Sequence, residues 1–184
     1  MLGEGGMVAF GGRGMSEVSV RHVEARDAEV IREIFQSPHV VRGTTRLPFQ
    51  ASEELSKRIG YDPAMLKLVA VIEDEVAGYA ELQTFPDWAR HRHAGEINMI
   101  TTHQRFRGRG VGDALMAAML EVADNWLRLR RVGLFCWEGN PKAVALYERH
   151  GFVREGVMRD FVVVDGGFCD ATMMGRIRRD PLDA

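Results

Sequence analysis

Residues 107–112, with the sequence RGRGVG, combine residue types that suit the binding of an anion. Three glycines alternate with other residues, and glycine costs the most backbone entropy on folding, which suggests that the backbone must come close to something here. An apolar helical pattern begins at Val111, and the first N–H groups of a helix lack hydrogen bonds and carry a partial positive charge. Because Arg107 and Arg109 add full charges, the natural ligand is a phosphate or a diphosphate.

Spacing excludes two common phosphate-binding motifs. A nucleoside-triphosphate loop needs G-x-x-x-x-G-K-[ST], and the required lysine and hydroxyl residue are both missing here. A dinucleotide fingerprint needs G-x-G-x-x-G early in the fold, whereas Gly108, Gly110 and Gly112 are spaced by two and come late in the chain. The segment therefore favours a diphosphate carrier of another kind. The alternative is a tight strand-to-helix turn with solvated arginines.

A second segment, NPKAVALYERHGF, carries polar groups that suit contact with such a carrier. Asn140 and Tyr147 are seven positions apart, or two helical turns, so their side chains lie on one face of a helix. This helix is expected to begin after Asn140, with Pro141 at its first position, and to end at Gly151. Taken alone, Asn140 also fits a helix cap and Tyr147 a half-buried core residue.

Hydrophobic periodicity predicts the elements that position these two segments. Strands are expected at residues 17–23, 66–73, 76–85, 95–103, 132–137, 157–164 and 168–178. Helices are expected within residues 25–38, within 52–63, from 111 to about 130, and within 140–151. Antiparallel hairpins at both ends surround a strand–helix–strand unit, which must cross over right-handed and pair parallel. The predicted class is α/β with a mixed sheet.

Several finer expectations follow from the same patterns. The hairpin turns are expected at Asp74–Glu75 and at Asp165–Gly167. The continuous apolar run VGLFCW predicts a strand that is covered on both faces. The inner face of the long helix is expected to carry Leu115, Ala118, Met119, Val122, Trp126 and Leu129.

Length and composition predict one domain in the cytoplasm. The chain has 184 residues, 46% of them hydrophobic, which is enough for one core, and we expect a single domain over residues 16–180. Residues 1–15 contain six glycines and are expected to form a flexible tail. A net charge of -2 argues against a nucleic-acid partner, and no apolar run is long enough for a membrane span or a signal peptide.

Together, R-G-R-G-V-G and N-x-x-A-x-x-x-Y-x-x-x-G-F resemble the GNAT superfamily of acyl-CoA-dependent N-acetyltransferases. The resemblance covers Glu17 to Arg178 and is strongest to YhhY-type bacterial amino-acid N-acetyltransferases, through the segments RHVEARDAEVIREI, ADNWLRLRRV and ALYERHGFVREG. It implies a mostly antiparallel sheet of six or seven strands flanked by about four helices. In that fold, a splayed parallel pair of strands binds coenzyme A.

The resemblance also implies which residues hold coenzyme A. The pyrophosphate would lie in a cradle of backbone N–H groups made by Arg107, Gly108, Arg109, Gly110, Val111 and Gly112. Met99, Ile100 and Thr101 would pair with the pantetheine arm as a missing strand would. Asn140 would form a hydrogen bond with the same arm, and Tyr147 would stand beside the thioester sulfur.

The implied reaction moves acetyl from acetyl-CoA directly to the primary amine of a small molecule, an amino acid or a related amine, in a ternary complex. Such an amine is mostly protonated at neutral pH, so a base must take its proton. Glu96 is the candidate, with His103 as an alternative, although Glu96 equally fits a surface ion pair with an arginine. A backbone N–H at Ile100 would stabilise charge on the carbonyl oxygen, and the Tyr147 hydroxyl would protonate the departing thiolate.

Two other functions fit the same motifs: acetylation of a protein N-terminus or lysine, and non-catalytic sensing of acyl-CoA. No metal is expected, because His91 and His93 are two positions apart without a third ligand in reach. A homodimer is expected, since such folds are often dimeric. Arg42 and Thr44 are candidate contacts to the carboxylate of an acceptor, or else solvated loop residues.

Overall fold

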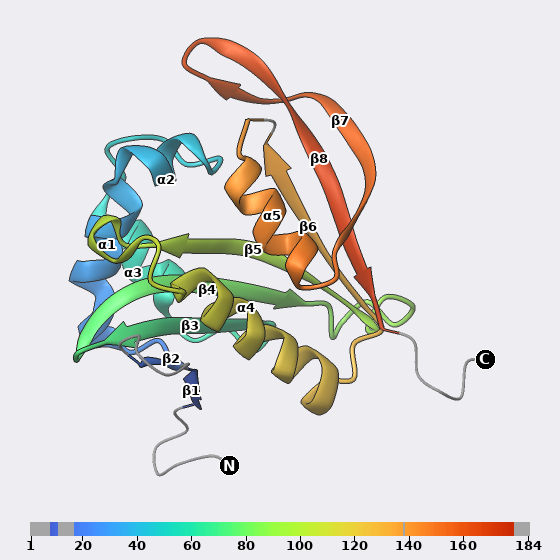
Figure 1. Ribbon diagram of the computed structural model, residues 1–184, viewed down its shortest axis with the longest axis horizontal. Helices are drawn as coiled ribbons and strands as arrows, with labels where there is room; N and C mark the ends of the chain where they lie inside the picture. Colours follow the sequence, from blue (N-terminus) through green and yellow to red (C-terminus); the bar gives the residue numbers. More distant parts are fainter. Residues whose placement is uncertain (1–7, 11–16, 138, 179–184) are drawn as a thin grey trace.

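Figure 1 shows the computed structural model of the chain, which describes residues 8–10, 17–137 and 139–178. One sheet forms the centre of this described part, in the order β1-β2-β3-β4-β5-β6-β8-β7. Its strands are β1 (Val8–Phe10), β2 (Val18–His22), β3 (Met65–Ile72), β4 (Glu75–Thr84), β5 (Ala94–Thr102), β6 (Arg131–Trp137), β7 (Val153–Val164) and β8 (Gly167–Ile177). Neighbouring strands pair antiparallel, except β5 and β6, which pair parallel.

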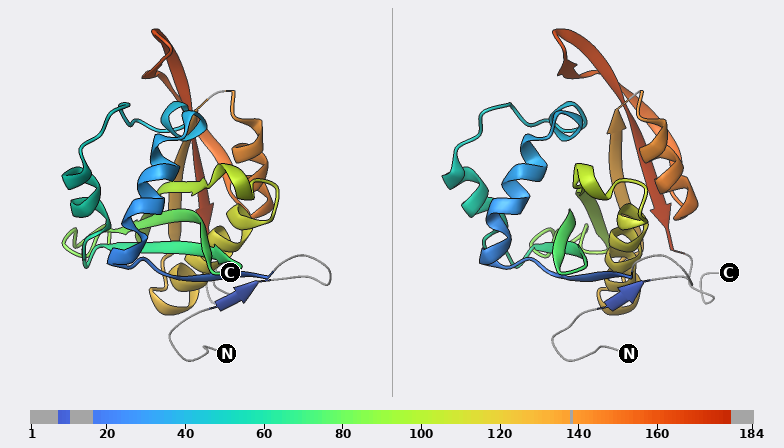
Figure 2. Two further views of the ribbon diagram at one scale, coloured as in Figure 1. Left: turned by 90° about the vertical axis from the view of Figure 1, so that its left-hand side faces the viewer. Right: turned by 60° about the vertical axis from the view of Figure 1, so that its left-hand side comes forward.

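Helices cover both faces of this sheet (Figure 2). They are α1 (Ala28–Gln36), α2 (Pro38–Arg42), α3 (Ser52–Ile59), α4 (Val111–Glu121) and α5 (Pro141–Arg149), with short helical turns at Ala25–Asp27, Gln104–Phe106 and Val122–Trp126. Strand residues alternate between two cores: Leu68 and Ala70 pack on the side of α4, and Val69 and Tyr79 pack on the side of α1. Within the described residues, no helix has the length and apolar character needed to cross a membrane.

The predicted α/β class with a mixed sheet is confirmed, and the strand–helix–strand unit is β5–α4–β6. Two elements were not predicted. Val8–Phe10 lie in the segment expected to be a tail and pair with β2, which makes eight strands in the described sheet; the rest of residues 1–15 lies outside the described residues. Pro38, the last residue of the segment 25–38 in which the first helix was expected, occupies the first position of α2, where its missing N–H costs nothing.

The prediction that the long helix reaches Arg130 is wrong, and so is the placement of Trp126 in the core. The last turn, Val122–Trp126, is a π-helix, in which the Leu127 N–H donates to the Val122 carbonyl. The wider turn ends the helix and rotates Trp126 off the apolar stripe, leaving it 67% exposed. A π-helical turn does not alter the spacing of hydrophobic residues in the sequence, so this spacing could not predict it.

Two smaller expectations also need correction. The first hairpin turn is formed by Glu73 and Asp74, both with positive φ, and Glu75 already belongs to β4. Strand β6 is not covered on both faces: Phe135 is 38% exposed, whereas its neighbours Leu134 and Cys136 are buried. The reason is that β6 borders an open cleft on one face.

The parallel pair splays apart after a short contact. Strand β5 pairs with β6 over Ala94–Ile97 alone, after which β5 continues beside β4 and β6 continues beside β8. A register shift in the β4–β5 pair leaves Asn98 as an extra residue in β5, and such a bulge bends a strand. One backbone edge of β5 beyond Ile97 is therefore left without a partner strand.

Tight packing of α4 on β4 gives a first prediction. A Cβ atom at Gly78 would lie 2.5 Å from Val111 Cγ1 and 2.7 Å from the Thr101 carbonyl oxygen, so Gly78→Ala is expected to lower the free energy of unfolding by about 1–3 kcal/mol. Thermal denaturation measures the loss. The control is Gly133→Ala, where the nearest atom is the Met174 carbonyl oxygen at 4.0 Å and stability should hold. Equal losses at both positions would contradict this account of the α4–β4 contact.

Candidate active site

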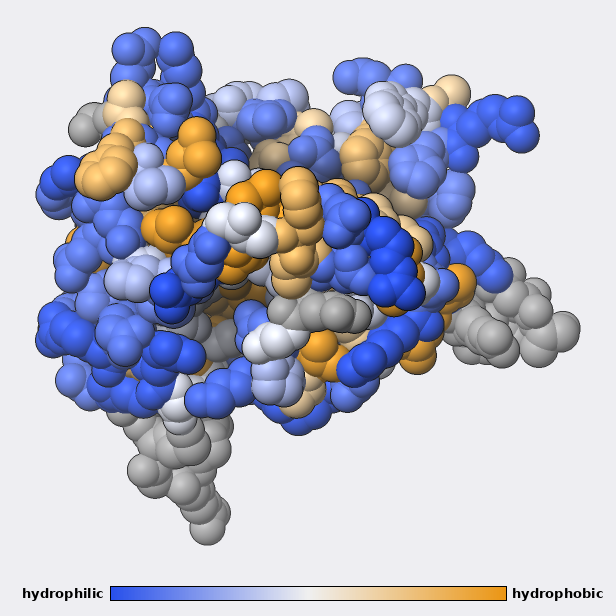
Figure 3. Space-filling model, turned by 90° about the horizontal axis from the view of Figure 1, so that it is seen from above, coloured by the Kyte–Doolittle hydropathy of each residue, from blue (hydrophilic) through white to orange (hydrophobic). Residues whose placement is uncertain are grey.

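The splayed strands open a cleft made of two adjoining cavities. The wide cavity, of about 390 Å³, is lined by Gly43, Thr44, Thr45, Arg46, Arg58, Glu96, Ile97, Asn98, Met99, Ile100, Phe135, Trp137, Tyr147 and Phe161. The narrow cavity, of about 160 Å³, is lined by His39, Val40, Gly43, Thr44, Ile100, Thr101, Thr102, Arg107, Gly112, Asn140, Ala143, Leu146 and Tyr147. Both cavities are lined by Gly43, Thr44, Ile100 and Tyr147. Figure 3 looks down on this end of the molecule, where hydrophobic side chains lie among hydrophilic ones.

The glycine turn presents backbone N–H groups at the start of α4. Gly108 and Gly110 have φ of 81° and 80°, and a Cβ at either position would meet nothing within 4 Å, so the outer side of the turn is open. The first N–H to bond within the helix is that of Ala114, which donates to the Gly110 carbonyl at 3.0 Å. The N–H groups of Val111, Gly112 and Asp113 come before it and have no helical acceptor, which fits a diphosphate. The Arg109 N–H, which was expected in the cradle, instead donates to the Phe106 carbonyl at 3.3 Å.

The other residues of the predicted cradle contribute in different ways. The Val111 side chain is buried, so only its backbone can meet a ligand. Gly112 allows close packing, because a Cβ there would lie 3.2 Å from Leu146 Cδ2 of α5 and this side chain would have to shift. Arg107 lines the narrow cavity, whereas Arg109 makes an ion pair of 2.9 Å with Glu73. The turn therefore offers mainly backbone donors, with Arg107 beside them.

Ile100 is the residue of β5 whose backbone faces the cleft. The His103 N–H donates to the Ala77 carbonyl of β4 at 2.8 Å, and alternate residues of a strand point their backbone groups to the same side. Thr101 and Met99 therefore also face β4, and both side chains are buried. The N–H and carbonyl of Ile100 point the other way. Of the three predicted strand residues, only Ile100 presents backbone groups to a ligand.

Asn140 and Tyr147 lie on one face of α5, as predicted. Asn140 Oδ1 caps the helix by accepting from the Ala143 N–H at 3.2 Å, and an amide that caps with its oxygen keeps its two N–H donors. Tyr147 is 8% exposed, more buried than expected. Burial, followed by the nearby Cys136 thiol, raises the pKa of Tyr147, so its hydroxyl keeps its proton at neutral pH.

Glu96 of β5 is a half-buried carboxylate on the wide cavity. Burial raises its pKa, and the charge of His91 offsets part of the rise. The surface ion pair that was the alternative reading of Glu96 is absent from the described part of the chain. A carboxylate with a raised pKa and a phenol that keeps its proton line the same cavity, so they can serve as a base and an acid in one cleft.

Comparison with known proteins identifies the fold. Residues 28–152 match the sequence model of the Acetyltransferase (GNAT) family, which is more than half of the chain. This chain belongs to the GNAT family. The predicted resemblance, the GNAT fold and the predicted class of activity, transfer of acetyl from acetyl-CoA to an amine, are confirmed.

Individual GNAT relatives agree with this assignment. The L-amino acid N-acetyltransferase AaaT of Escherichia coli (strain K12) is 34% identical over 166 residues, which are 89% of this chain and 100% of AaaT. A crystal structure of a putative phosphinothricin N-acetyltransferase superposes with a TM-score of 0.78 at 26% identity, over 89% of this chain and 99% of that one. The Vibrio cholerae spermidine N-acetyltransferase, in complex with CoA and spermine, shares the fold with a TM-score of 0.76 at 24% identity, over 87% and 95% of the two chains.

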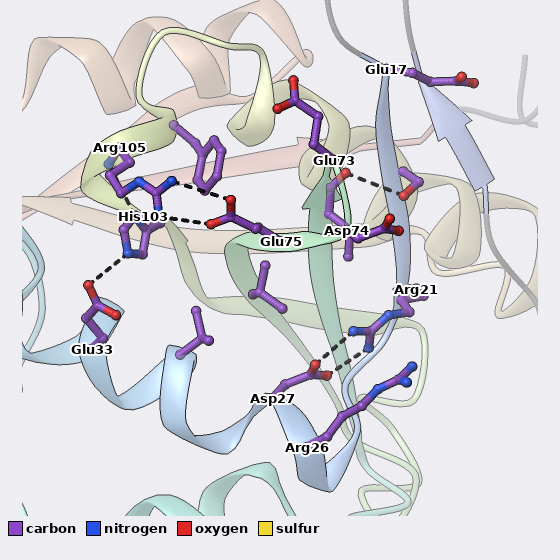
Figure 4. Close-up of a pocket in the computed structure, with 15 residues that line it drawn as sticks. Glu17, Arg21, Arg26, Asp27, Glu33, Glu73, Asp74, Glu75, His103 and Arg105 are labelled. Carbon is purple, nitrogen blue, oxygen red and sulfur yellow. Dashed lines mark hydrogen bonds and ion pairs between the residues drawn. The ribbon is translucent and has the colours of Figure 1, made fainter.

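A larger hollow, of about 740 Å³, lies elsewhere on this GNAT domain and shares no lining residue with the cleft. Figure 4 shows that several of its charged groups pair with one another. Its ion pairs join Arg21 to Asp27 at 2.8 Å, Arg105 to Glu75 at 2.9 Å, and His103 to Glu33 at 3.2 Å. We therefore place the candidate active site in the cleft.

His103 belongs to this hollow and not to the cleft. Its Nδ1 accepts from the Arg105 N–H at 3.1 Å, so its Nε2 carries the proton and faces Glu33. Both ring nitrogens are engaged. The prediction of His103 as an alternative base is therefore wrong.

Several residues of the wide cavity were not predicted from the sequence. Phe135 and Trp137 of β6 form an aromatic wall with Phe161 of β7, whose ring centre lies 5.8 Å and 5.6 Å from theirs. The alternation within VGLFCW could have placed Phe135 and Trp137 on one face. Arg46 and Arg58 come from a loop and a helix without any spacing signal.

Thr44 and Arg42, the two candidate contacts to an acceptor carboxylate, lie in different places in the structure. Thr44 lines both cavities, and its hydroxyl donates to the Val40 carbonyl at 2.8 Å. Arg42 lines neither, and it makes an ion pair of 3.3 Å with Asp165 in the β7–β8 turn. Arg42 therefore links the two sides of the cleft.

Proposed function

We propose that this chain transfers acetyl from acetyl-CoA to the primary amine of a small molecule, an amino acid or a related amine, by direct transfer in a ternary complex. The observation that carries the proposal is that Glu96, Tyr147 and the backbone of Ile100 meet at one cavity, which continues toward the glycine turn. The similarity to AaaT supports an amino acid as the acceptor.

Coenzyme A fits the narrow side of the cleft. The open glycine turn would hold its pyrophosphate, Ile100 would pair with its peptide-like arm, and the Asn140 amide would donate to that arm. When bound, acetyl-CoA supplies an activated acetyl thioester. The residues of the chain have to orient the reacting carbonyl and transfer the protons.

Three groups of the chain would transfer protons or stabilise developing charge during the reaction. The Glu96 carboxylate would take a proton from the incoming ammonium, so that the nitrogen lone pair is free to form the new C–N bond. The Ile100 N–H would donate to the carbonyl oxygen as that oxygen gains charge. The Tyr147 hydroxyl would donate its proton to the sulfur as the C–S bond breaks, and solvent or the acceptor's proton would restore it.

The backbone of the glycine turn gives the prediction for coenzyme A binding. Gly110→Ala puts a side chain at φ 80°, which strains the residue by about 1–2 kcal/mol and should tilt the first N–H groups of α4. We expect calorimetry to give a Kd for coenzyme A about tenfold higher. Gly166→Ala is the matched control, because Gly166 has a φ of 82° in the β7–β8 turn. An unchanged Kd in Gly110→Ala would argue that phosphates bind elsewhere.

The competing functions differ in what the cleft must admit. A protein N-terminus or lysine needs an open groove for peptide, whereas α2 and the β7–β8 turn are joined here by the Arg42–Asp165 ion pair. A sensor of acyl-CoA would need neither Glu96 nor Tyr147. An acceptor screen that follows thiol release from acetyl-CoA separates the three. Release with small amines supports the proposal, release with peptides alone supports the second function, and coenzyme A binding without release supports the sensor.

A homodimer and a cytoplasmic location belong to the same proposal. Strand β7 is one edge of the described sheet, and its hairpin with β8 carries the exposed apolar residues Val153, Val163 and Phe168. A second copy of the chain would cover such an edge. Nucleic acid and membranes are not expected as partners.

A further inference from the structure

A half-buried cation, Arg46, lines the same wide cavity as the groups that the proposed mechanism uses. Arg46 lies between α2 and α3, and its guanidinium carbon lies 3.9 Å from the centre of the Phe35 ring. Its Nη1 donates to Gln50 Oε1. These contacts on the face and at one nitrogen hold the guanidinium plane in place.

The other edge of the Arg46 guanidinium has no partner. Its Nε and Nη2 are buried and make no hydrogen bond within the described chain. These two nitrogens carry the parallel N–H groups that bind a carboxylate in bidentate fashion. The neighbouring Arg58 uses this same edge on Glu81, with distances of 2.6 Å from Nε and 2.5 Å from Nη2. Arg46 presents the edge without the carboxylate.

The charged groups around Arg46 do not neutralise its positive charge. Glu81 is already bound by Arg58 and also accepts from the Tyr79 hydroxyl at 2.6 Å. Burial, followed by the charge of Arg58, lowers the pKa of Arg46 to about 10, although Glu81 and Glu54 act in the opposite direction. Arg46 therefore remains charged at neutral pH. A half-buried cation with two buried, unpaired donor nitrogens is costly, and an anion that reaches them would remove that cost.

A further unpaired donor comes from another wall of the same cavity. Trp137 Nε1 of β6 is buried and has no hydrogen-bond partner among the described residues. An ionised carboxylate only accepts hydrogen bonds, so it matches a set of donors that lacks acceptors. Glu96 lines the same space and suits a positively charged amine.

We propose that Arg46 binds the carboxylate of the acceptor and thereby restricts this enzyme to amines that carry one, such as amino acids. The inference rests on the proposed acetyl transfer, because it directs the amino group toward Glu96 in the same cavity. A zwitterion then meets a partner for each of its charges. A polyamine carries only positive charges and is repelled by Arg46.

Matched acceptors test the role of the carboxylate. Phenylalanine, phenylalaninamide and phenethylamine share a side chain and an amine, and they are compared by thiol release from acetyl-CoA at equal concentrations of free amine. We expect kcat/KM for phenylalanine to exceed that for the other two by about 100-fold. Spermidine should be a poor acceptor.

The variant Arg46→Met removes the charge and keeps an unbranched side chain beside Phe35. We expect it to raise the KM for phenylalanine by about 100-fold with little change in kcat, and to leave phenethylamine unaffected. Its melting temperature should not fall, since a half-buried charge with two buried nitrogens that lack partners has been removed. Arg32→Met is the control, because Arg32 lies outside the cleft and pairs with Glu29 on the surface of α1.

The outcomes separate this inference from the proposed function. Equal use of all three acceptors, or an equal loss with phenylalanine and phenethylamine in Arg46→Met, would overturn the role of Arg46 and leave acetyl transfer intact. If no acceptor releases thiol, acetyl transfer itself fails, and a calorimetric titration of phenylalanine into the coenzyme A complex decides the role of Arg46. Binding that Arg46→Met abolishes supports it, and equal or absent heat in both proteins rejects it.

Discussion

Replacing Tyr147 with phenylalanine is expected to lower kcat by about 100- to 1,000-fold, while the Kd for coenzyme A stays nearly constant. The ring remains packed against Phe152, whose centre lies 6.2 Å away, so the substitution removes little more than the hydroxyl. That hydroxyl is the proton donor beside the departing sulfur in the proposed mechanism. Without it, a thiolate leaves into a buried space where charge is poorly solvated.

The measurement is steady-state thiol release, with calorimetric titration of coenzyme A on the same preparations. Tyr61→Phe is the control, because Tyr61 is an exposed tyrosine outside the cleft. Since burial raises the pKa of Tyr147, the wild-type enzyme should also show no alkaline loss of kcat from this group below the ordinary tyrosine range, near pH 10. Unchanged kcat in Tyr147→Phe would leave Tyr147 with a packing role alone and would exclude its hydroxyl as the proton donor.

The glycine turn and the Asn140–Tyr147 pair could be found from the sequence because each depends on local geometry. Positive φ at Gly108 and Gly110 is a property of a few consecutive residues, and helical spacing alone aligns Asn140 with Tyr147. The class of fold followed from the order of strand and helix patterns. These features require no knowledge of which distant segments come together.

Arg46 and the aromatic wall could not be found in this way. Arg46 lies in a segment without hydrophobic periodicity. Its proposed role depends on three features of the structure: Phe35 contacts one face of the guanidinium, Gln50 accepts from one nitrogen, and no carboxylate of the described chain binds the other edge. Phe161 lies within a register shift of β7 between Met158 and Val162, so counting along the strand does not place it. Both depend on contacts between segments far apart in the chain.

The same limit explains why burial was predicted poorly at single positions. The hydrophobic pattern placed Trp126 inside and left open whether Glu96 was a surface residue. A π-turn removed the first from the core, and the splay of β5 from β6 half-buried the second. In both cases a change in backbone course, which residue type does not encode, decided the exposure of the side chain.

Glu96→Gln is expected to lower kcat/KM near neutral pH by about 100- to 10,000-fold, the range for loss of a general base. Since burial raises the pKa of Glu96, its basic form is complete only at a pH above the ordinary glutamate range, and wild-type activity should rise with pH through that raised pKa. In Glu96→Gln this acid limb should vanish. The deficit should shrink toward the pKa of the acceptor amine, because an amine that is already deprotonated needs no base. The pH profiles of kcat/KM measure this, with the exposed Glu53→Gln as control.

The change in stability caused by Glu96→Gln distinguishes a catalytic role of Glu96 from a structural one. A carboxyl whose pKa is higher in the folded state binds its proton more tightly there, so stability falls as pH rises from the unfolded pKa through the folded one. At neutral pH the wild-type protein therefore carries the cost of an ionised, half-buried Glu96, and Gln removes it. Melting temperatures should show the variant at least as stable at neutral pH, with the difference shrinking on acidification. A variant that is both inactive and less stable would mean that Glu96 stabilises the fold. A catalytic base that lowers the stability of the wild-type protein predicts an inactive variant of equal or higher stability.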